Sequence, residues 1–332
     1  MFPLMQRSLT SPLIRIGAVL VTLALAGCSS AAPAESGPAA APAPESGAFP
    51  VSVEHSLGTT TVERAPERIV TLGMTDADVV LALGEVPVGI ASPYNFPRGV
   101  GVWAEDELGA ATPAVMGREI NYEAVAALQP DLILDVVSGG EQERYDTLSR
   151  IAPTVALPAG ALPYAPAWQE STELIAEALG KEAEGAELVA RTERYVTDVA
   201  AAHPGFAGRT LTYIDAYGAE AYAGGRDATA VQLMGELGFE PVPYLRDLQS
   251  EETQILVSNE LLGQLDADVV LLYAFGETPE QALQQNAGLG TLPAVRDGRA
   301  YWLPDLSLSA PSVLSIPYGV DTLLPFLEGA TS

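Results

Sequence analysis

Two stretches of this chain, YEAVAALQPDLIL at residues 122–134 and NELLGQLDADVVL at residues 259–271, match at an offset of 137. Each has apolar residues at helical spacing followed by a short apolar run, which is typical of a helix that leads into a buried strand. A second pair, LGEVPV at 83–88 and LGFEPV at 237–242, occurs in the same order. Together the two pairs predict two lobes of similar construction.

Between these motifs, short apolar runs alternate with helical patterns. Strands are expected at 69–72 and 132–134 in the first half, and at 210–214 and 269–272 in the second. Helices are expected between them, for example at 229–237. Such alternation favours βα units and a mostly parallel sheet in each half.

The segment KEAEGAELVARTERYVTDVAAA at residues 181–202 predicts one long helix, since it has no proline and ends before Pro204. At 1.5 Å per residue it would be about 33 Å long, enough to join two lobes. We therefore expect an α/β fold of two Rossmann-like lobes joined by a single long rigid helix. The expected bounds are 49–167 for the N-terminal lobe, 168–203 for the helical segment and 204–332 for the C-terminal lobe.

The composition excludes several classes of protein. Asp and Glu number 43 against 16 Lys and Arg, so the net charge of −27 repels nucleic acid. One cysteine and two histidines, His55 and His203, are too few for a disulfide framework or a four-ligand zinc site. The sequence contains no Gly-x-Ser-x-Gly, His-Glu-x-x-His or phosphate-binding glycine motif. We expect neither an enzyme nor a cofactor or metal held by the protein itself.

The N-terminus has the pattern of a secretory signal. Residues 1–27 carry Arg7 and Arg15, no acid and an apolar stretch too short to span a membrane. The stretch ends in LAGC, which resembles the bacterial lipobox with Cys28 as the lipidated residue. Residues 28–48, rich in Ala, Pro, Ser and Glu, are expected to form a flexible tether. These features predict a protein anchored by lipid on the extracytoplasmic face of the cell membrane.

Four motifs together resemble the substrate-binding proteins of iron-siderophore and vitamin B12 ABC importers, and the likeness extends over residues 55–327. They are APERIVTL at 65–72, the stretch at 122–134, SNELLGQLDADVV at 258–270 and LPAVRDGRAY at 292–301. The resemblance implies a class III periplasmic-binding-protein-like fold, a ferric siderophore as ligand, an ABC permease as partner and a monomeric state.

The resemblance also implies a role for the two glutamates that the repeat aligns. In such proteins one Glu on each lobe meets arginines of the permease, and the matching positions are Glu123 and Glu260. Two carboxylates far apart on one face would orient and steer docking. The alternative is that each is an acid in the first turn of a helix, where the helix dipole favours it.

Candidate ligand residues are the Arg, Tyr and Trp side chains near the ends of expected strands, where open α/β sheets bind ligands. Such side chains can bond chelating oxygens and pack against a ferric complex. Arg118 and Arg226 are similar in position to ligand-binding arginines of the family. The aromatic candidates are Tyr94, Trp103, Tyr217, Tyr222, Tyr273 and Trp302. Each could instead pair with surface acid or pack in the core.

Other readings stay open at the level of sequence. Haem could be held by a single axial Tyr, and cobalamin by an aromatic cleft of the same fold. A surface sensor lipoprotein without a transport role is a further alternative. The chemical class of the siderophore is also open, since arginines suit anionic catecholates and aromatic residues suit hydroxamates.

Overall fold

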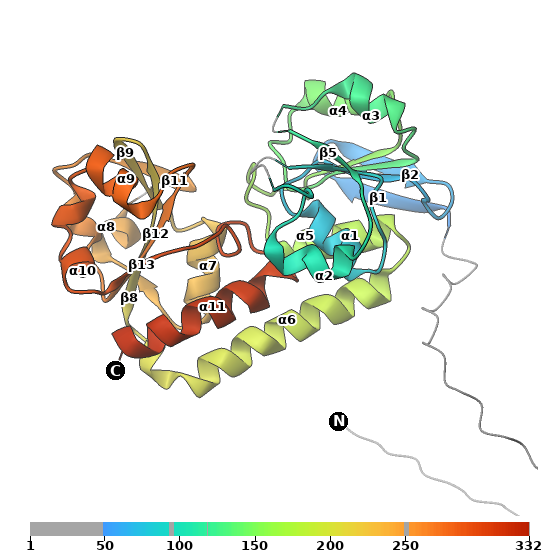
Figure 1. Ribbon diagram of the computed structural model, residues 1–332. Helices are drawn as coiled ribbons and strands as arrows, with labels where there is room; N and C mark the ends of the chain where they lie inside the picture. The colour runs from blue at the N-terminus through green and yellow to red at the C-terminus, as the bar shows by residue number, and fades with distance from the viewer. Residues whose placement is uncertain (1–48, 93–95, 118, 249–251, 332) are drawn as a thin grey trace, which may run out of the picture. The chain divides into compact units, whose positions relative to one another are not determined.

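The computed structural model describes residues 49–331 except 93–95, 118 and 249–251 (Figure 1). The expected signal peptide at 1–27, the lipidation site Cys28 and the tether at 28–48 lie outside the described residues. So do two of the candidate ligand residues, Tyr94 and Arg118.

The first half of the described chain forms a hairpin and a five-stranded parallel sheet with the strand order β5-β4-β3-β6-β7. The central strands β3 and β6 are fully buried, as expected for apolar strands covered on both faces. The elements are β1 (Val51–His55), β2 (Gly58–Val62), β3 (Ile69–Thr71), α1 (Asp76–Ala82), β4 (Gly89–Ala91), α2 (Glu105–Leu108), β5 (Ala114–Met116), α3 (Tyr122–Ala127), β6 (Leu132–Asp135), α4 (Gln142–Leu148), β7 (Thr154–Ala156) and α5 (Trp168–Ala178).

The second half forms a six-stranded mixed sheet with the order β11-β9-β8-β12-β13, in which β10 also pairs with β8. The pairs β8–β9 and β9–β11 are antiparallel, which the alternation of strands and helices did not indicate. The elements are β8 (Thr210–Tyr217), β9 (Glu220–Gly224), α7 (Thr229–Glu236), β10 (Glu240–Pro241), α8 (Pro243–Asp247), β11 (Gln254–Val257), β12 (Val269–Ala274), α9 (Pro279–Gln285), α10 (Pro293–Arg296), β13 (Ala300–Trp302) and α11 (Ser315–Ala330).

The two sheets share a topology. In the first, β3 lies between β4 and β6, and β7 follows β6; in the second, β8 lies between β10 and β12, and β13 follows β12. All of these neighbours run parallel. The sequence repeat thus marks equivalent strands, and the two-lobed α/β prediction is confirmed. The repeat is imperfect at residues 259–265, where a turn and a short 3-10 helix (Leu262–Leu265) replace the α-helix seen at α3. Gly263 in this segment has low helix propensity.

The helix expected at 181–202 is α6 (Glu182–Ala202), which contacts α5 of the first lobe and α7 of the second. Figure 1 shows α11 running beside it. Both ends of α6 are held by polar contacts. Lys181 donates to the carbonyl of Leu83 at 2.7 Å and to Glu85 at 2.6 Å, and the His203 ring lies 3.0 Å from Glu328 of α11. These contacts fix the helix to both lobes.

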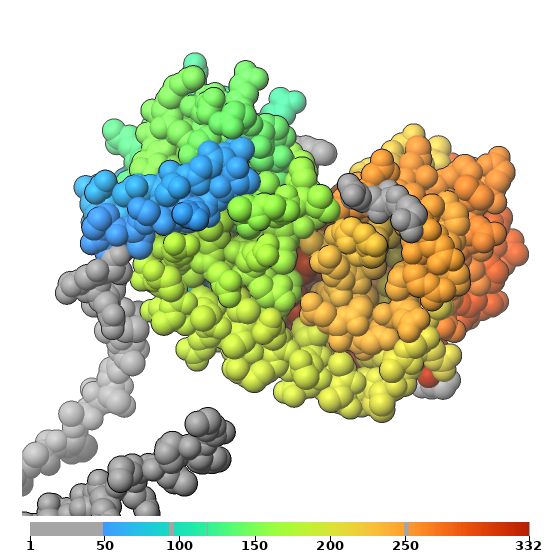
Figure 2. Space-filling view, turned by 180° about the vertical axis from the view of Figure 1, so that it is seen from behind, coloured from blue at the N-terminus to red at the C-terminus, as the bar shows by residue number. Residues whose placement is uncertain are grey.

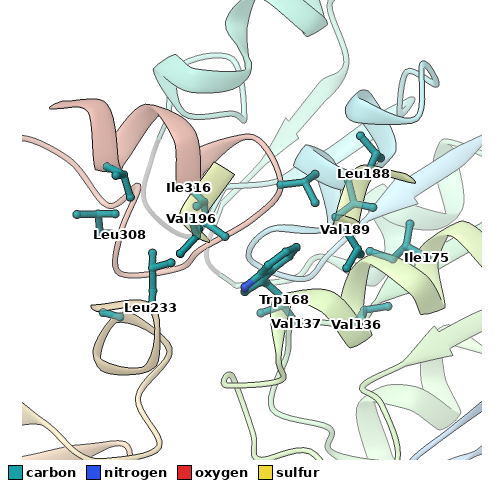
Figure 3. Close-up of a cluster of buried hydrophobic side chains, with 14 of the residues drawn as sticks. Val136, Val137, Trp168, Ile175, Leu188, Val189, Val196, Leu233, Leu308 and Ile316 are labelled. Carbon is teal, nitrogen blue, oxygen red and sulfur yellow. The ribbon is translucent and has the colours of Figure 1, made fainter. Parts of the chain in front are cut away.

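One hydrophobic core runs through both lobes. It joins strands β3 and β6 of the first sheet to β8 and β12 of the second through buried residues of α5, α6, α7 and α11. Figure 3 shows Trp168 of α5 close to Val137 of the first lobe. Leu308 and Ile316, which follow β13 in the chain, lie on the other side of the same cluster. Because apolar surface from both lobes is buried in one cluster, separating the lobes would expose it to water.

Replacement Trp168→Ala should destabilise both lobes together. The Trp168 side chain is 7% exposed and lies in the shared cluster, so its loss should lower the free energy of unfolding by about 3–5 kcal/mol. Urea unfolding followed by circular dichroism should show one transition in the wild type and one, at lower urea, in the variant. Val102→Ala, at a side chain 62% exposed, is the control. A variant in which only one lobe melts early would contradict a shared core.

Candidate functional site

A cavity of about 720 Å³ opens between the two lobes. Figure 2 shows the surface hollowed between the green first lobe and the gold part of the second. The lining comes from the carboxyl ends of equivalent strands: Leu72 and Met74 follow β3, Val137 and Ser138 follow β6, Asp215 and Tyr217 end β8, and Tyr273 and Phe275 end β12. This is where open α/β sheets bind ligands, and the volume is that of a small-molecule site.

Strand β8 directs three polar or aromatic side chains toward the cavity. Tyr213, Asp215 and Tyr217 alternate along it and therefore share one face. Asp215 is 4% exposed, and it accepts hydrogen bonds from the Tyr213 hydroxyl and the Gln254 amide, both at 2.7 Å. Burial raises the pKa of Asp215 to about 6, although both hydrogen bonds oppose the shift. The carboxylate is therefore mostly ionised at neutral pH, and a hydrogen bond to each oxygen holds its orientation.

The same wall carries a group of stacked aromatic rings. The rings of Tyr217 and Phe275 stack with centroids 4.2 Å apart, and Tyr273 meets Phe275 edge to face at 4.6 Å. The rings of Tyr222 and Tyr217 meet edge to face with their centroids 5.6 Å apart. Burial, followed by the charges of Asp305 and Asp215, raises the pKa of Tyr273. These rings offer a broad apolar face bordered by hydroxyl groups.

The first lobe contributes an arginine that is already engaged. Arg144 of α4 lines the cavity, and its Nε and a terminal nitrogen both bond the carboxylate of Asp135 at the end of β6. Asp135 is 3% exposed, so the Arg144 guanidinium is fixed by a buried partner.

Tyr164, also in the lining, is half exposed and has φ of 59°, a strained value for a non-glycine residue. Its backbone N–H donates to the carbonyl of Ser138 at 2.8 Å, which supports this conformation.

The expected ligand residues divide into two groups. Tyr217 and Tyr273 line the cavity, and Tyr222 lies against Tyr217 with its hydroxyl donating to Glu220 at 2.9 Å. Arg226 follows the lining residue Gly224; its side chain is 68% exposed and lies 3.3 Å from Asp227. These four residues lie at or next to the cavity wall of the second lobe.

Trp103 and Trp302 lie outside the residues that line the cavity. Trp302 on β13 packs against a separate hydrophobic cluster of its own lobe, which includes Leu265, Leu272 and Leu292. The Trp103 indole N–H donates at 2.7 Å to Asp78, which also accepts from Ser312 at 2.6 Å. Because Ser312 belongs to the segment that leads from the second lobe into α11, this buried contact joins the two lobes.

The two glutamates aligned by the repeat are both exposed but differ in local structure. Glu123 lies in the first turn of α3, whose N-cap Asn121 accepts from the Ala124 N–H at 3.0 Å. Glu260 lies in a turn after β11. Its own backbone N–H and then the Ser258 hydroxyl lower the pKa of its carboxyl group. A helix dipole therefore accounts for the acid at Glu123 and not for the one at Glu260.

Several lining residues were missed by sequence reasoning. The alternation of Tyr213, Asp215 and Tyr217 along an otherwise apolar strand was a usable signal, since polar groups on one face of a buried strand need partners. No sequence pattern marked Arg144 or Tyr164 as cavity residues, because α4 and the loop before α5 reach the cavity only through the tertiary fold.

A family model described as periplasmic binding protein matches residues 69–306. The chain belongs to the periplasmic binding protein family. The family match covers strands of both sheets, from β3 to β13, and therefore includes the elements that form the cavity.

Three similar proteins illustrate the relationship. The probable siderophore-binding lipoprotein YfiY of Bacillus subtilis is 26% identical, over 77% of this chain and 80% of its own length. The Fe(3+)-citrate-binding protein YfmC of the same organism is 30% identical, over 74% and 75%. The crystal structure of PiaA from Streptococcus pneumoniae in complex with ferrichrome has a TM-score of 0.71 at 29% identity, covering 85% of this chain and 98% of that one.

Two further observations concern the described residues alone. Nowhere among them do three His, Cys, Asp or Glu side chains gather as a group that could hold a metal ion. None of their helices is both long enough and apolar enough to cross a membrane.

Replacement Asp78→Asn should reduce the pH dependence of the free energy of unfolding between about pH 4 and pH 6. Burial raises the pKa of Asp78 from 3.8 to about 6, so in this window the folded protein holds a proton that the unfolded chain has released. The free energy of unfolding of the wild type should therefore fall as the pH rises, by on the order of 3 kcal/mol from this group. Asparagine does not titrate and adds no such slope.

Urea unfolding at a series of pH values measures this slope. Asp198→Asn, which removes an exposed carboxylate from α6, serves as the control and should leave the wild-type profile unchanged. Equal slopes in the wild type and the Asp78→Asn variant would show that Asp78 is not the titrating group.

Proposed function

We propose that this protein is an extracytoplasmic receptor, anchored by lipid on Cys28, that captures a ferric siderophore and delivers it to an ABC permease. The observation that carries the proposal is the cavity of about 720 Å³ between the lobes of a periplasmic binding protein, walled by aromatic rings and a few fixed polar groups. The names of the relatives, which include a probable siderophore-binding lipoprotein and a protein crystallised with ferrichrome, support the choice of ligand. The proposed role is binding and delivery without catalysis.

The ligand would contact the aromatic wall of the second lobe. Tyr217, Tyr273 and Phe275 present ring faces and edges at the ends of β8 and β12, which suits the apolar backbone of a chelator. Tyrosine hydroxyl groups, and the guanidinium of Arg226 two residues after the lining residue Gly224, would donate to its oxygens. Arg118 stays a proposed ligand residue by resemblance alone.

Delivery would use Glu123 and Glu260. Both are exposed acids, one in each lobe, and the repeat places them at equivalent positions. Since the helix dipole accounts for only one of them, a shared role in docking is a simpler account of the pair. Two separated carboxylates would fix the orientation of both lobes against a basic surface.

Replacement Tyr217→Ala should weaken binding of a ferric siderophore about tenfold or more. The Tyr217 ring is 37% exposed, stacks on Phe275 and lines the cavity, so its loss removes ring contact with the ligand. Tryptophan-fluorescence titration of the full chain with ferric hydroxamate, ferric catecholate, haem and cobalamin measures the affinity. Tyr122→Ala is the matched control, because Tyr122 is 36% exposed and does not line the cavity. Unchanged affinity in Tyr217→Ala would show that the ligand does not contact this wall. Tight binding of haem or cobalamin, without binding of a ferric siderophore, would show that the ligand is not a siderophore.

The double replacement Glu123→Lys with Glu260→Lys should abolish uptake of the ferric siderophore by cells and leave its affinity in solution unchanged. The reversal turns attraction to a basic permease surface into repulsion without touching the cavity. Glu187→Lys with Asp198→Lys, at two exposed acids of α6, changes the net charge equally and should transport normally. Normal uptake by the first double variant would refute the docking role.

A further inference from the structure

The described residues that line the cavity offer little positive charge that a ligand could use. Among the described residues that line it, Arg144 is the one cation, and Asp135 already engages its Nε and a terminal nitrogen. The ion pair of Arg144 and Asp135 is neutral as a whole. Two nitrogens of the guanidinium already donate to the carboxylate, so they are not available to a ligand. An anionic ligand at this wall would have to compete with a covalently tethered and buried partner.

The opposite wall adds negative charge. Asp215 lines the cavity, is 4% exposed and is kept in place by Tyr213 and Gln254. Asp305 lies close enough to Tyr273 for its charge to raise the pKa of that hydroxyl, after burial. Arg226, two residues after the lining residue Gly224, has the Asp227 carboxylate 3.3 Å from its guanidinium. The described part of the site therefore has more carboxylate than guanidinium charge available to a ligand.

The charge of a ferric chelate depends on its donor groups. A hydroxamate carries one negative charge, so three of them neutralise Fe³⁺, and an ammonium group on the chelator makes the complex cationic. A catecholate carries two, so the tris-catecholate complex is triply negative. In a cavity of low dielectric constant such a complex would be repelled by Asp215 and would find no unpaired guanidinium among the described lining residues to offset the repulsion.

We infer that the cavity selects a neutral or cationic ferric trihydroxamate and rejects triply negative chelates, with Asp215 as the residue that sets this selectivity. The inference rests on the proposed function and narrows it. The stacked rings of Tyr217 and Phe275 fit the same ligand class, since the outer surface of a trihydroxamate complex is largely apolar chain.

The test compares three probes on the full chain at pH 7.5: ferrichrome, which is neutral, ferrioxamine B, which is cationic, and ferric enterobactin, which is triply negative. Ferrichrome and ferrioxamine B should each bind about 100-fold more tightly than ferric enterobactin. In Asp215→Asn the affinity for ferric enterobactin should rise about tenfold while that for ferrichrome changes less than about threefold. Asp198→Asn removes one carboxylate from the surface of α6 and should change neither affinity.

The possible results distinguish a failure of the proposed selectivity from a failure of the proposed receptor function. Binding of ferric enterobactin as tight as that of ferrichrome would overturn the selectivity and leave the receptor role intact. Binding of no ferric chelate would overturn both. If Asp215→Asn fails to fold, Asp135→Asn gives a second reading: it releases the Arg144 fork and should likewise raise the affinity for ferric enterobactin. The wild-type ranking decides the selectivity, and an unchanged affinity for ferric enterobactin in a folded Asp215→Asn variant would overturn the assignment of that selectivity to Asp215.

Discussion

The structure depends on one constraint, which is that its two lobes bury their apolar surface in a common core. Strands from both sheets, together with α5, α6, α7 and α11, contribute to the same cluster, and Trp168 lies within it. Polar contacts reinforce this junction at Asp78, which accepts from Trp103 and Ser312, and at both ends of α6. Wide opening of the lobes would break all of these at once, so the distance between the cavity walls is set by the fold before any ligand arrives.

A cavity with fixed walls recognises ligands through the charges and rings placed on them. The buried Asp215 and the closed Arg144–Asp135 pair cannot turn outward to suit a different ligand without losing hydrogen bonds. The aromatic wall is less specific, because stacked rings accept many apolar surfaces. In this molecule shape and ring contact would therefore supply affinity, and the buried charges would decide which complexes are excluded.

The exposed acids differ from the buried ones in their surroundings. The net charge of −27 lies mostly on the outer surface, where water and salt screen it, so it has little influence on a ligand inside the cavity. It leaves the isolated pair Glu123 and Glu260 to be distinguished from many other surface acids by position alone. Glu123 and Glu260 differ from the other surface acids because they occupy equivalent positions in the repeat. Since only Glu123 lies in an α-helix, helix formation does not account for an acid at both positions.

The sequence by itself determined the two-lobed α/β fold, the long helix α6 and two cavity residues, Tyr217 and Tyr273. These follow from local patterns, namely hydrophobic periodicity, an internal repeat and the rule that ligands lie beyond strand ends. Only the tertiary structure decided that Arg144 and Tyr164 reach the cavity, that Arg144 is held by Asp135, and that Trp103 joins the lobes rather than lining the site. The physical reason is that the partner of a buried polar group is chosen by packing between segments far apart in the chain, and no local pattern records that choice.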